Sequence, residues 1–113
     1  MKKYERVKSQ QDFQKVISSQ QRYNSKNFVV YYLKNEQYSY PRFGIATSKK
    51  LGNAVTRNKI RRQVRAMIQQ IKKVHSIEIK DYVIIVKKTY CTNNYKTNLQ
   101  MLENVLVKSE EIK

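Results

Sequence analysis

The 113-residue sequence has little of several features that define other classes of protein. Its single cysteine, Cys91, excludes an intrachain disulfide and gives no sign of an oxidising compartment, so the cytoplasm is the expected location. Two glycines and one proline leave no low-complexity linker, which predicts a single domain over residues 1–113. The apolar runs, such as residues 28–33 and 82–86, are far too short for a membrane-spanning helix, and no membrane partner is expected.

Acidic residues are also scarce. The chain has 24 Lys and Arg against 8 Asp and Glu, a formal net charge of +16. No acidic residue lies between Glu36 and Glu78. That stretch holds ten basic residues: Arg42, Lys49, Lys50, Arg57, Lys59, Arg61, Arg62, Arg65, Lys72 and Lys73. Like charge concentrated in this way predicts a polyanionic partner.

The usual ingredients of independent catalysis are missing. His75 is the only histidine, and it has neither an HxxxH pattern nor a cysteine partner for binding a metal. His75 is also the only histidine that could activate Cys91 as a nucleophile. A lone thiol between a strand and a helix is usually inert. The sequence therefore predicts no catalytic residue, no metal site and no cofactor bound by the protein itself.

The first half of the chain contains one short helix pattern and two strand patterns. Phe13, Val16 and Ile17 follow Ser9 at helical spacing and predict a helix over 9–19. Residues 28–33 and 42–48 alternate as strands do. We expect these two strands to pair as a hairpin.

The second half begins with a longer helix. After the turn at Gly52-Asn53, an apolar stripe at helical spacing predicts a helix over 54–73. The stripe consists of Ile60, Val64, Met67, Ile68 and Ile71. Residues 82–86 predict a buried central strand, and Asn93-Asn94 precedes a last helix with one apolar face. The fold class is α+β, a single-domain α-β sandwich of order αβββαβα around a sheet of about four strands.

The helix over 54–73 carries a basic face opposite its apolar stripe. Arg57, Arg61 and Arg65 succeed one another at i+4, with Asn58 and Arg62 beside them. The planar fork of arginine bridges phosphate oxygens, and asparagine bonds ribose hydroxyls or base edges, so the mixture suits folded RNA. Two lysines and the backbone amides around the preceding turn predict an anion site at the helix start.

The spaced string Lys49-Lys50-x-Gly52-Asn53-Ala54-Val55-x-Arg57-Asn58, followed by Arg61-Arg62-x-x-Arg65, resembles the signature of the protein subunit of bacterial ribonuclease P. The resemblance extends over about residues 6–107. It implies a fold like domain 2 of ribosomal protein S5, in a ribonucleoprotein that removes the 5′ leader from precursor tRNA. In that family the RNA subunit holds the active site and its magnesium ions, and the protein assists.

The resemblance also implies two RNA-binding regions. The residues that match the family's contacts with the RNA subunit are Lys49, Lys50, Asn53, Arg57, Asn58, Arg61, Arg62 and Arg65. The residues that match the family's cleft for the single-stranded leader are Phe13, Ile17, Val29 and Tyr31. Stacking of an unpaired base on an aromatic ring contributes about 1–3 kcal/mol. An ordinary core position remains the alternative for Phe13. Ile17 stands where the family often has an aromatic residue, and Ala66 where it often has a polar one.

Two other functions share these features. A ribosomal or other structural RNA-binding protein has the same charge and size without assisting a nuclease. A DNA-binding module would place the basic helix in a major groove, but the apolar stripe leaves only one face free and no dimerisation segment is evident. No DNA partner is therefore expected.

Overall fold

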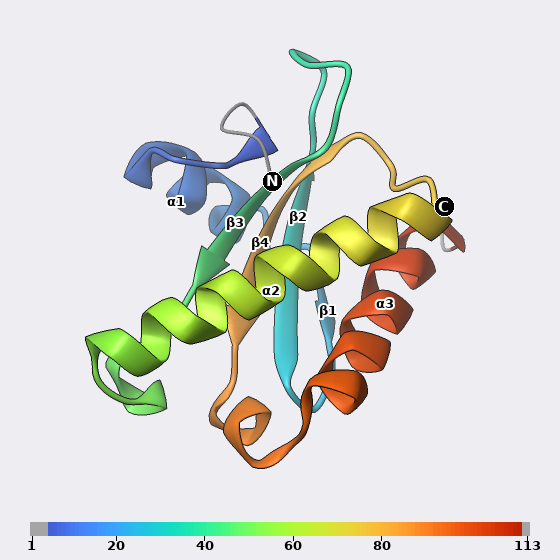
Figure 1. Cartoon of the computed structure of the whole chain (residues 1–113). Helices are drawn as coiled ribbons and strands as arrows, with labels where there is room; N and C mark the ends of the chain where they lie inside the picture. The colour runs from blue at the N-terminus through green and yellow to red at the C-terminus, as the bar shows by residue number, and fades with distance from the viewer. Residues whose placement is uncertain (1–4, 112–113) are drawn as a thin grey trace.

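The computed structural model describes the backbone of residues 5–111 and the side chains of residues 5–107 (Figure 1). Its helices and strands are α1 (Gln10–Ser18), β1 (Arg22–Asn24), β2 (Phe28–Lys34), β3 (Arg42–Ala46), α2 (Ala54–Val74), β4 (Lys80–Val86) and α3 (Tyr95–Glu111), with 3-10 turns η2 (Lys49–Leu51) and η3 (Lys88–Thr92). This order confirms the predicted αβββαβα arrangement. Strand β1 has only three residues, too few for a periodic pattern, and the sequence does not place it.

The strands form one mixed sheet in the order β1-β2-β4-β3. The predicted hairpin between residues 28–33 and 42–48 is wrong, because β4 lies between β2 and β3. It pairs antiparallel with β2 and parallel with β3. Parallel neighbours need a long crossover, and α2 supplies it between β3 and β4. The predicted central position of residues 82–86 is confirmed, since that strand is apolar on both faces and suits the middle of a sheet.

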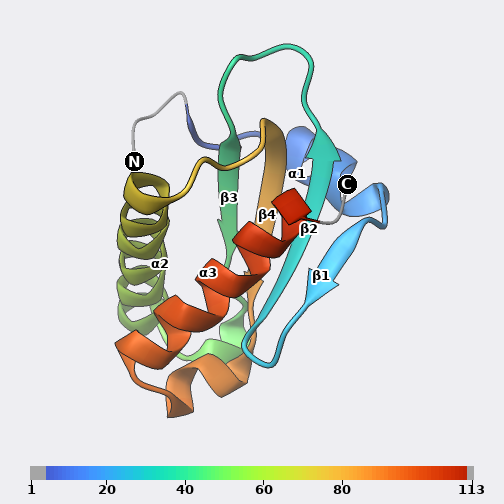
Figure 2. The same ribbon diagram turned by 90° about the vertical axis from the view of Figure 1, so that its right-hand side faces the viewer.

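Helices α2 and α3 cover one face of the sheet and α1 lies on the other (Figure 2). The core beneath α2 and α3 contains Phe28, Val30, Phe43, Tyr82 and Ile84 from the strands, the predicted apolar stripe of α2, and Leu102, Val105 and Leu106 of α3. Burial of each such side chain stabilises the fold by about 1.5–3 kcal/mol. The arginines of α2 are therefore fixed in direction by the packing of its opposite face.

Each predicted helix start is confirmed by its capping residue. Ser9 Oγ accepts a hydrogen bond from Asp12 N at 3.0 Å at the start of α1. Asn53 caps α2, and Asn94 Oδ1 caps α3 by accepting from Thr97 N at 2.8 Å. Gly52 has a φ of 135°, a value that other residues rarely adopt, and it lets the chain turn sharply from η2 into α2.

Strand register sorts the residues on the face that carries α1. Three rows cross from β2 through β4 to β3: Val29, Ile85 and Ala46; Tyr31, Val83 and Gly44; Leu33, Asp81 and Arg42. The N-terminal half of α1 lies over β3, where the Phe13 ring sits against Gly44. Its C-terminal end lies beside β2, where Ser19 Oγ donates to Tyr32 O at 2.9 Å. Helix α1 thus crosses the middle of the sheet, between the row of Val29 and the row of Asp81.

Candidate nucleic-acid interface

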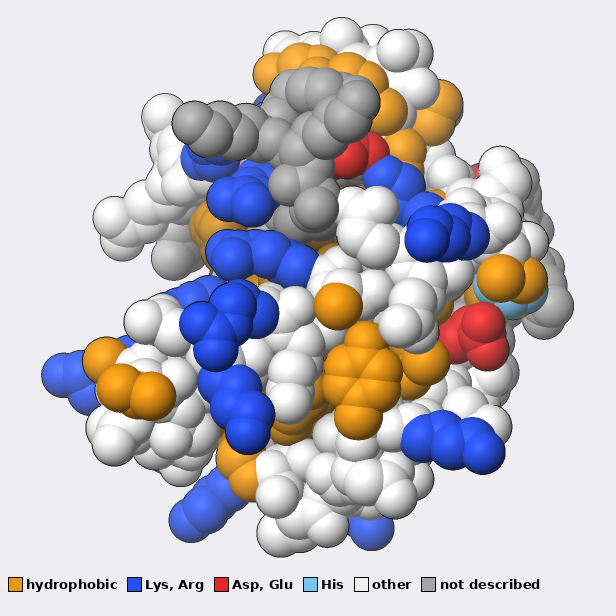
Figure 3. Space-filling model, viewed as in Figure 1, with side chains coloured by type: hydrophobic (Ala, Val, Ile, Leu, Met, Phe, Trp, Pro, Cys, Tyr) orange, Lys and Arg blue, Asp and Glu red, His pale blue; other side chains and the backbone are white. Residues whose placement is uncertain are grey.

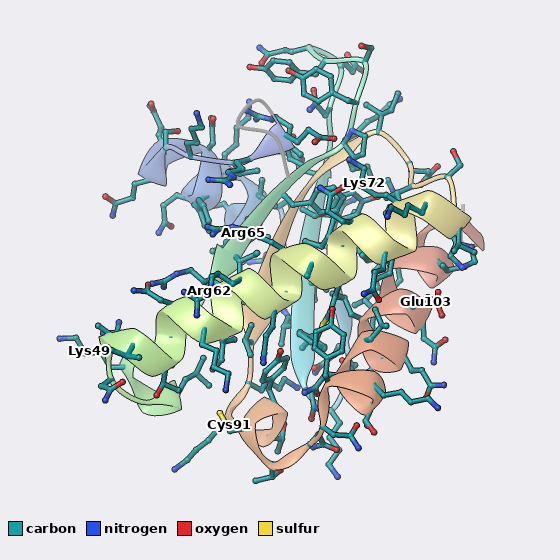
Figure 4. All side chains as sticks on the ribbon, in the orientation of Figure 1. Lys49, Arg62, Arg65, Lys72, Cys91 and Glu103 are labelled. Atoms are coloured by element: carbon teal, nitrogen blue, oxygen red, sulfur yellow. The ribbon has the colours of Figure 1, made fainter. Side chains whose placement is uncertain are left out.

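The predicted row of arginines lies in the first half of α2, beside the edge strand β3. Arg57, Arg61 and Arg65 are one helical turn apart and all are half-buried, while Asn58 and Arg62 are exposed. Figure 4 shows Arg62 and Arg65 in this half of the helix, away from Lys72 at the other end. The structure therefore brings the five motif residues of α2 onto one continuous surface.

Two neighbours hold the Arg61 guanidinium in place. It donates to Thr47 Oγ1 at 2.5 Å and to Asn58 Oδ1, so both side chains fix its orientation. The Nε atoms of Arg57 and Arg65 are buried and make no hydrogen bond within the part of the chain that the structure describes. A guanidinium ordered before binding loses less conformational freedom when it meets a phosphate.

Among the side chains that the structure describes, these cations have no acidic counterpart nearby. Among residues 5–107, no ion pair forms with any of Lys49, Lys50, Arg57, Arg61, Arg62 and Arg65. The carboxylates that form ion pairs do so elsewhere, as Asp81 does with Arg42 and Glu5 with Lys72. Burial lowers the pKa of Arg65, and the neighbouring charges of Arg6 and Arg61 lower it further. Positive charge accumulates here without compensation, as a polyanion site requires.

The start of α2 adds two free lysines and a cap. Lys49 and Lys50 are exposed in η2, directly before the turn. Asn53 Oδ1 accepts from Thr56 N at 2.9 Å, so its side-chain oxygen already serves the helix. The predicted contact of Asn53 with RNA is therefore expected to involve its side-chain NH2 group. No acidic residue occupies the first turn, which leaves the positive end of the helix unopposed.

The four residues predicted for a single strand lie on the face that α1 crosses. Val29 and Tyr31 are in neighbouring rows of β2, and both are half-buried. Phe13 and Ile17, also half-buried, come from α1. The Arg22 guanidinium lies 6.0 Å from the centre of the Tyr31 ring and supplies a cation beside it. The structure gives all four the partial exposure that contact with an unpaired strand needs.

A pocket links this face to the arginines of α2. It has a volume of about 270 Å³ and is lined by Arg6, Val7, Lys8, Phe13, Phe43, Gly44, Ile45 and Arg65. Figure 3 shows the corresponding column of Lys and Arg side chains, which runs from the side of α1 down over the first half of α2. Arg6 and Lys8 are absent from the predicted site because no pattern in the sequence connects the N-terminal segment to α2. That segment reaches the pocket by pairing with β3, where Val7 N donates to Phe43 O at 3.0 Å.

Gly44 allows Phe13 to reach the sheet. A Cβ atom at residue 44 would lie 2.5 Å from Phe13 Cζ and 2.9 Å from Cε2. Gly44→Ala is therefore expected to displace the ring and destabilise the protein by about 1–3 kcal/mol, measured by urea unfolding.

The double variant Phe13→Ala/Gly44→Ala separates this clash from other effects. It should be no less stable than Phe13→Ala alone, because the added methyl group then has room. A Gly44→Ala protein as stable as the wild type, with an unshifted Phe13 ring, would contradict the packing described.

The remaining sequence predictions concern residues away from this surface. His75 ends α2 and lies 3.3 Å from Glu103 Oε2. The thiol of Cys91 is exposed, and its Sγ lies 3.9 Å from Leu51 O. In the described part of the chain, no group of three or more His, Cys, Asp and Glu residues could hold a metal ion. Nor does any helix between residues 5 and 111 have the length and apolarity to span a membrane.

Comparison with known proteins supplies a family. A family model described as Ribonuclease P matches residues 1–110. The ribonuclease P protein component of Mesoplasma florum is 42% identical over 108 residues, which cover 96% of this chain and 97% of that protein. The one from Streptococcus agalactiae serotype III is 42% identical over 106 residues, 94% of either chain.

Solved structures agree with this likeness. The RNase P protein of Staphylococcus aureus has a TM-score of 0.83 at 35% identity, over 93% of this chain and 94% of its own. The RNase P protein of Thermotoga maritima has a TM-score of 0.79 at 30% identity, over 90% and 94%. The expected likeness to domain 2 of ribosomal protein S5 stays a prediction.

Proposed function

Because the chain belongs to the ribonuclease P protein family, we propose that it binds the catalytic RNA subunit through α2 and the 5′ leader of precursor tRNA through the face crossed by α1. The RNA subunit carries out the cleavage with its own magnesium ions, and the protein positions the substrate, in the cytoplasm. The protein alone does not cleave.

The observation that carries this proposal is the unpaired cationic surface of α2. The core fixes the opposite face of α2 and Thr47 holds Arg61, yet no carboxylate neutralises these cations in the described residues. A phosphate backbone supplies the missing counter-charge, and each guanidinium–phosphate contact is charge-assisted and geometrically specific. The surface thus suits a folded RNA.

The leader assignment has its own test in Tyr31. Tyr31→Ala removes a ring on which an unpaired base stacks, worth about 1–3 kcal/mol. We expect the assembled enzyme to lose about five- to a hundredfold in affinity for precursor tRNA, with little change for mature tRNA, in equilibrium binding measurements. Tyr31→Phe keeps the ring and is expected to behave as the wild type. If Tyr31→Ala weakened both ligands equally, the leader would not bind here.

A ribosomal or other structural RNA-binding role is not favoured, because the matched family and relatives are ribonuclease P proteins. Tagged protein recovered from cells should carry the ribonuclease P RNA in preference to ribosomal RNA. Competition should show that precursor tRNA displaces bound RNA far better than duplex DNA does. Recovery of ribosomal RNA alone would overturn the proposal.

A further inference from the structure

The loop between β2 and β3 presents two tyrosines on the far side of α1 from Val29. Tyr38 is exposed and lies at the tip of this loop, and the Tyr38 and Tyr40 rings are 5.3 Å apart. Figure 3 shows hydrophobic side chains gathered at the top of the molecule, above the column of Lys and Arg.

A buried ion pair fixes the position of Tyr38. Arg42 donates to both oxygens of Asp81, at 2.9 and 2.6 Å, and its guanidinium lies 4.4 Å from the centre of the Tyr38 ring. Asn35 also bonds Asp81, at 2.7 Å, while its own Oδ1 accepts from the backbone N–H of Tyr38. One carboxylate thus holds both the start of the loop and the cation under the ring. Such an ordered ring binds without paying again for its immobilisation.

Basic side chains line a pocket next to Tyr38. A pocket of about 280 Å³ lies between the loop and the segment before α1, lined by Arg6, Lys8, Ser9, Asp12, Tyr38, Tyr40 and Arg42. Asp12 Oδ2 faces Arg42 at 3.7 Å, as Asp81 does at closer range. Both carboxylates are therefore directed at the buried Arg42, and two further cations, Arg6 and Lys8, also line the pocket.

The same two cations line the pocket beside Phe13 and Arg65. The two pockets are therefore adjacent along the edge of β3, one on each side of the segment that carries Arg6 and Lys8. Along this edge, Arg6 and Lys8 therefore lie between the Phe13 ring in one pocket and the Tyr38 ring in the other. Alternating cations and aromatic rings are what unpaired RNA uses for its phosphates and bases.

We propose that Tyr38 is a stacking platform for an unpaired nucleotide of the leader, upstream of the nucleotides held at Phe13 and Tyr31, with Arg6 and Lys8 contacting the adjoining phosphates. This inference rests on the proposed function, since it extends the path of the same strand. It assigns to Arg42 and Asp81 a positioning role, because they act on the RNA only through the Tyr38 ring.

The test uses the assembled enzyme and two precursor tRNAs, one with a long leader and one whose leader is cut back to the few nucleotides next to the cleavage site. Tyr38→Ala is expected to lower the affinity for the long-leader substrate by about five- to a hundredfold and to leave the short-leader substrate unchanged. Tyr38→Phe keeps the ring, and Gln37→Ala changes a neighbour in the same loop. Both should bind as the wild type, and the thermal midpoints of all four proteins should agree to exclude misfolding.

Three results would overturn the inference in different ways. If Tyr38→Ala bound both substrates as tightly as the wild type, no nucleotide would stack there. If it weakened both substrates equally, or weakened assembly with the RNA subunit itself, the occupant would not be the upstream leader. If the wild-type protein failed to assemble with the RNA subunit at all, the proposed function would fail together with the inference.

Discussion

Replacing both Arg57 and Arg61 with alanine is expected to weaken assembly with the RNA subunit by at least about a hundredfold. Hydrogen bonds to charged groups contribute about 1.5–3 kcal/mol each, and both guanidinium groups lie in the unpaired surface of α2. Loss of their phosphate contacts should also reduce the slope of log K against log salt by roughly 1 to 2. Filter binding of the labelled RNA subunit over a series of salt concentrations measures both quantities.

The matched control removes the same charge from elsewhere. Lys73 and Lys96 are exposed in α2 and α3, away from the arginine row. The double variant Lys73→Ala/Lys96→Ala is expected to lower affinity only slightly, through the long-range field. If both double variants lost affinity equally, the partner would respond to net charge, and the α2 surface would have no special role.

Asp81→Ala is expected to destabilise the protein by about 3–5 kcal/mol, because it leaves Arg42 buried without its main counter-ion. Arg42 is only 9% exposed, and the hydrogen bonds that it donates to Asp81 raise its pKa. The remaining carboxylate, Asp12, lies 3.7 Å away and does not replace a two-point contact. The loss is a large fraction of the 5–15 kcal/mol typical of a small protein, and urea unfolding measures it.

An exposed ion pair in the adjoining loop provides the comparison. The Lys34 and Glu36 side chains are 79% and 80% exposed and 3.7 Å apart. Glu36→Ala should change stability by less than about 1 kcal/mol, as solvent-exposed pairs do. An Asp81→Ala protein that unfolded at nearly the wild-type urea concentration would show that Arg42 is rehydrated without structural cost.

The sequence predicted α2 and its surface well because local rules determine them. The turn at Gly52-Asn53, the apolar stripe and the i+4 spacing of Arg57, Arg61 and Arg65 all lie within one helix and its cap. Once the apolar face of α2 packs on the sheet, its arginine face must point away from the core. These residues needed no knowledge of the remaining chain.

Strand pairing and the N-terminal contacts were beyond local rules. Adjacent strand patterns at 28–33 and 42–48 favour a hairpin, and only the later β4 strand, inserted between them, excludes it. Arg6 and Lys8 reach the pocket because Val7 pairs with β3, a contact between segments far apart in the chain. One signal was present: Gly44 and Ala46 alternate with larger residues in β3, which indicates that a neighbour approaches that face closely.

The most direct test of the proposed function is cleavage of precursor tRNA by the ribonuclease P RNA at low magnesium, with and without this protein. A chain of net charge +16 supplies cations that the RNA and its substrate otherwise need from the solution. We expect the protein to restore release of the 5′ leader under these conditions and to release none without the RNA. Failure to stimulate a cognate RNA, or cleavage by the protein alone, would contradict it.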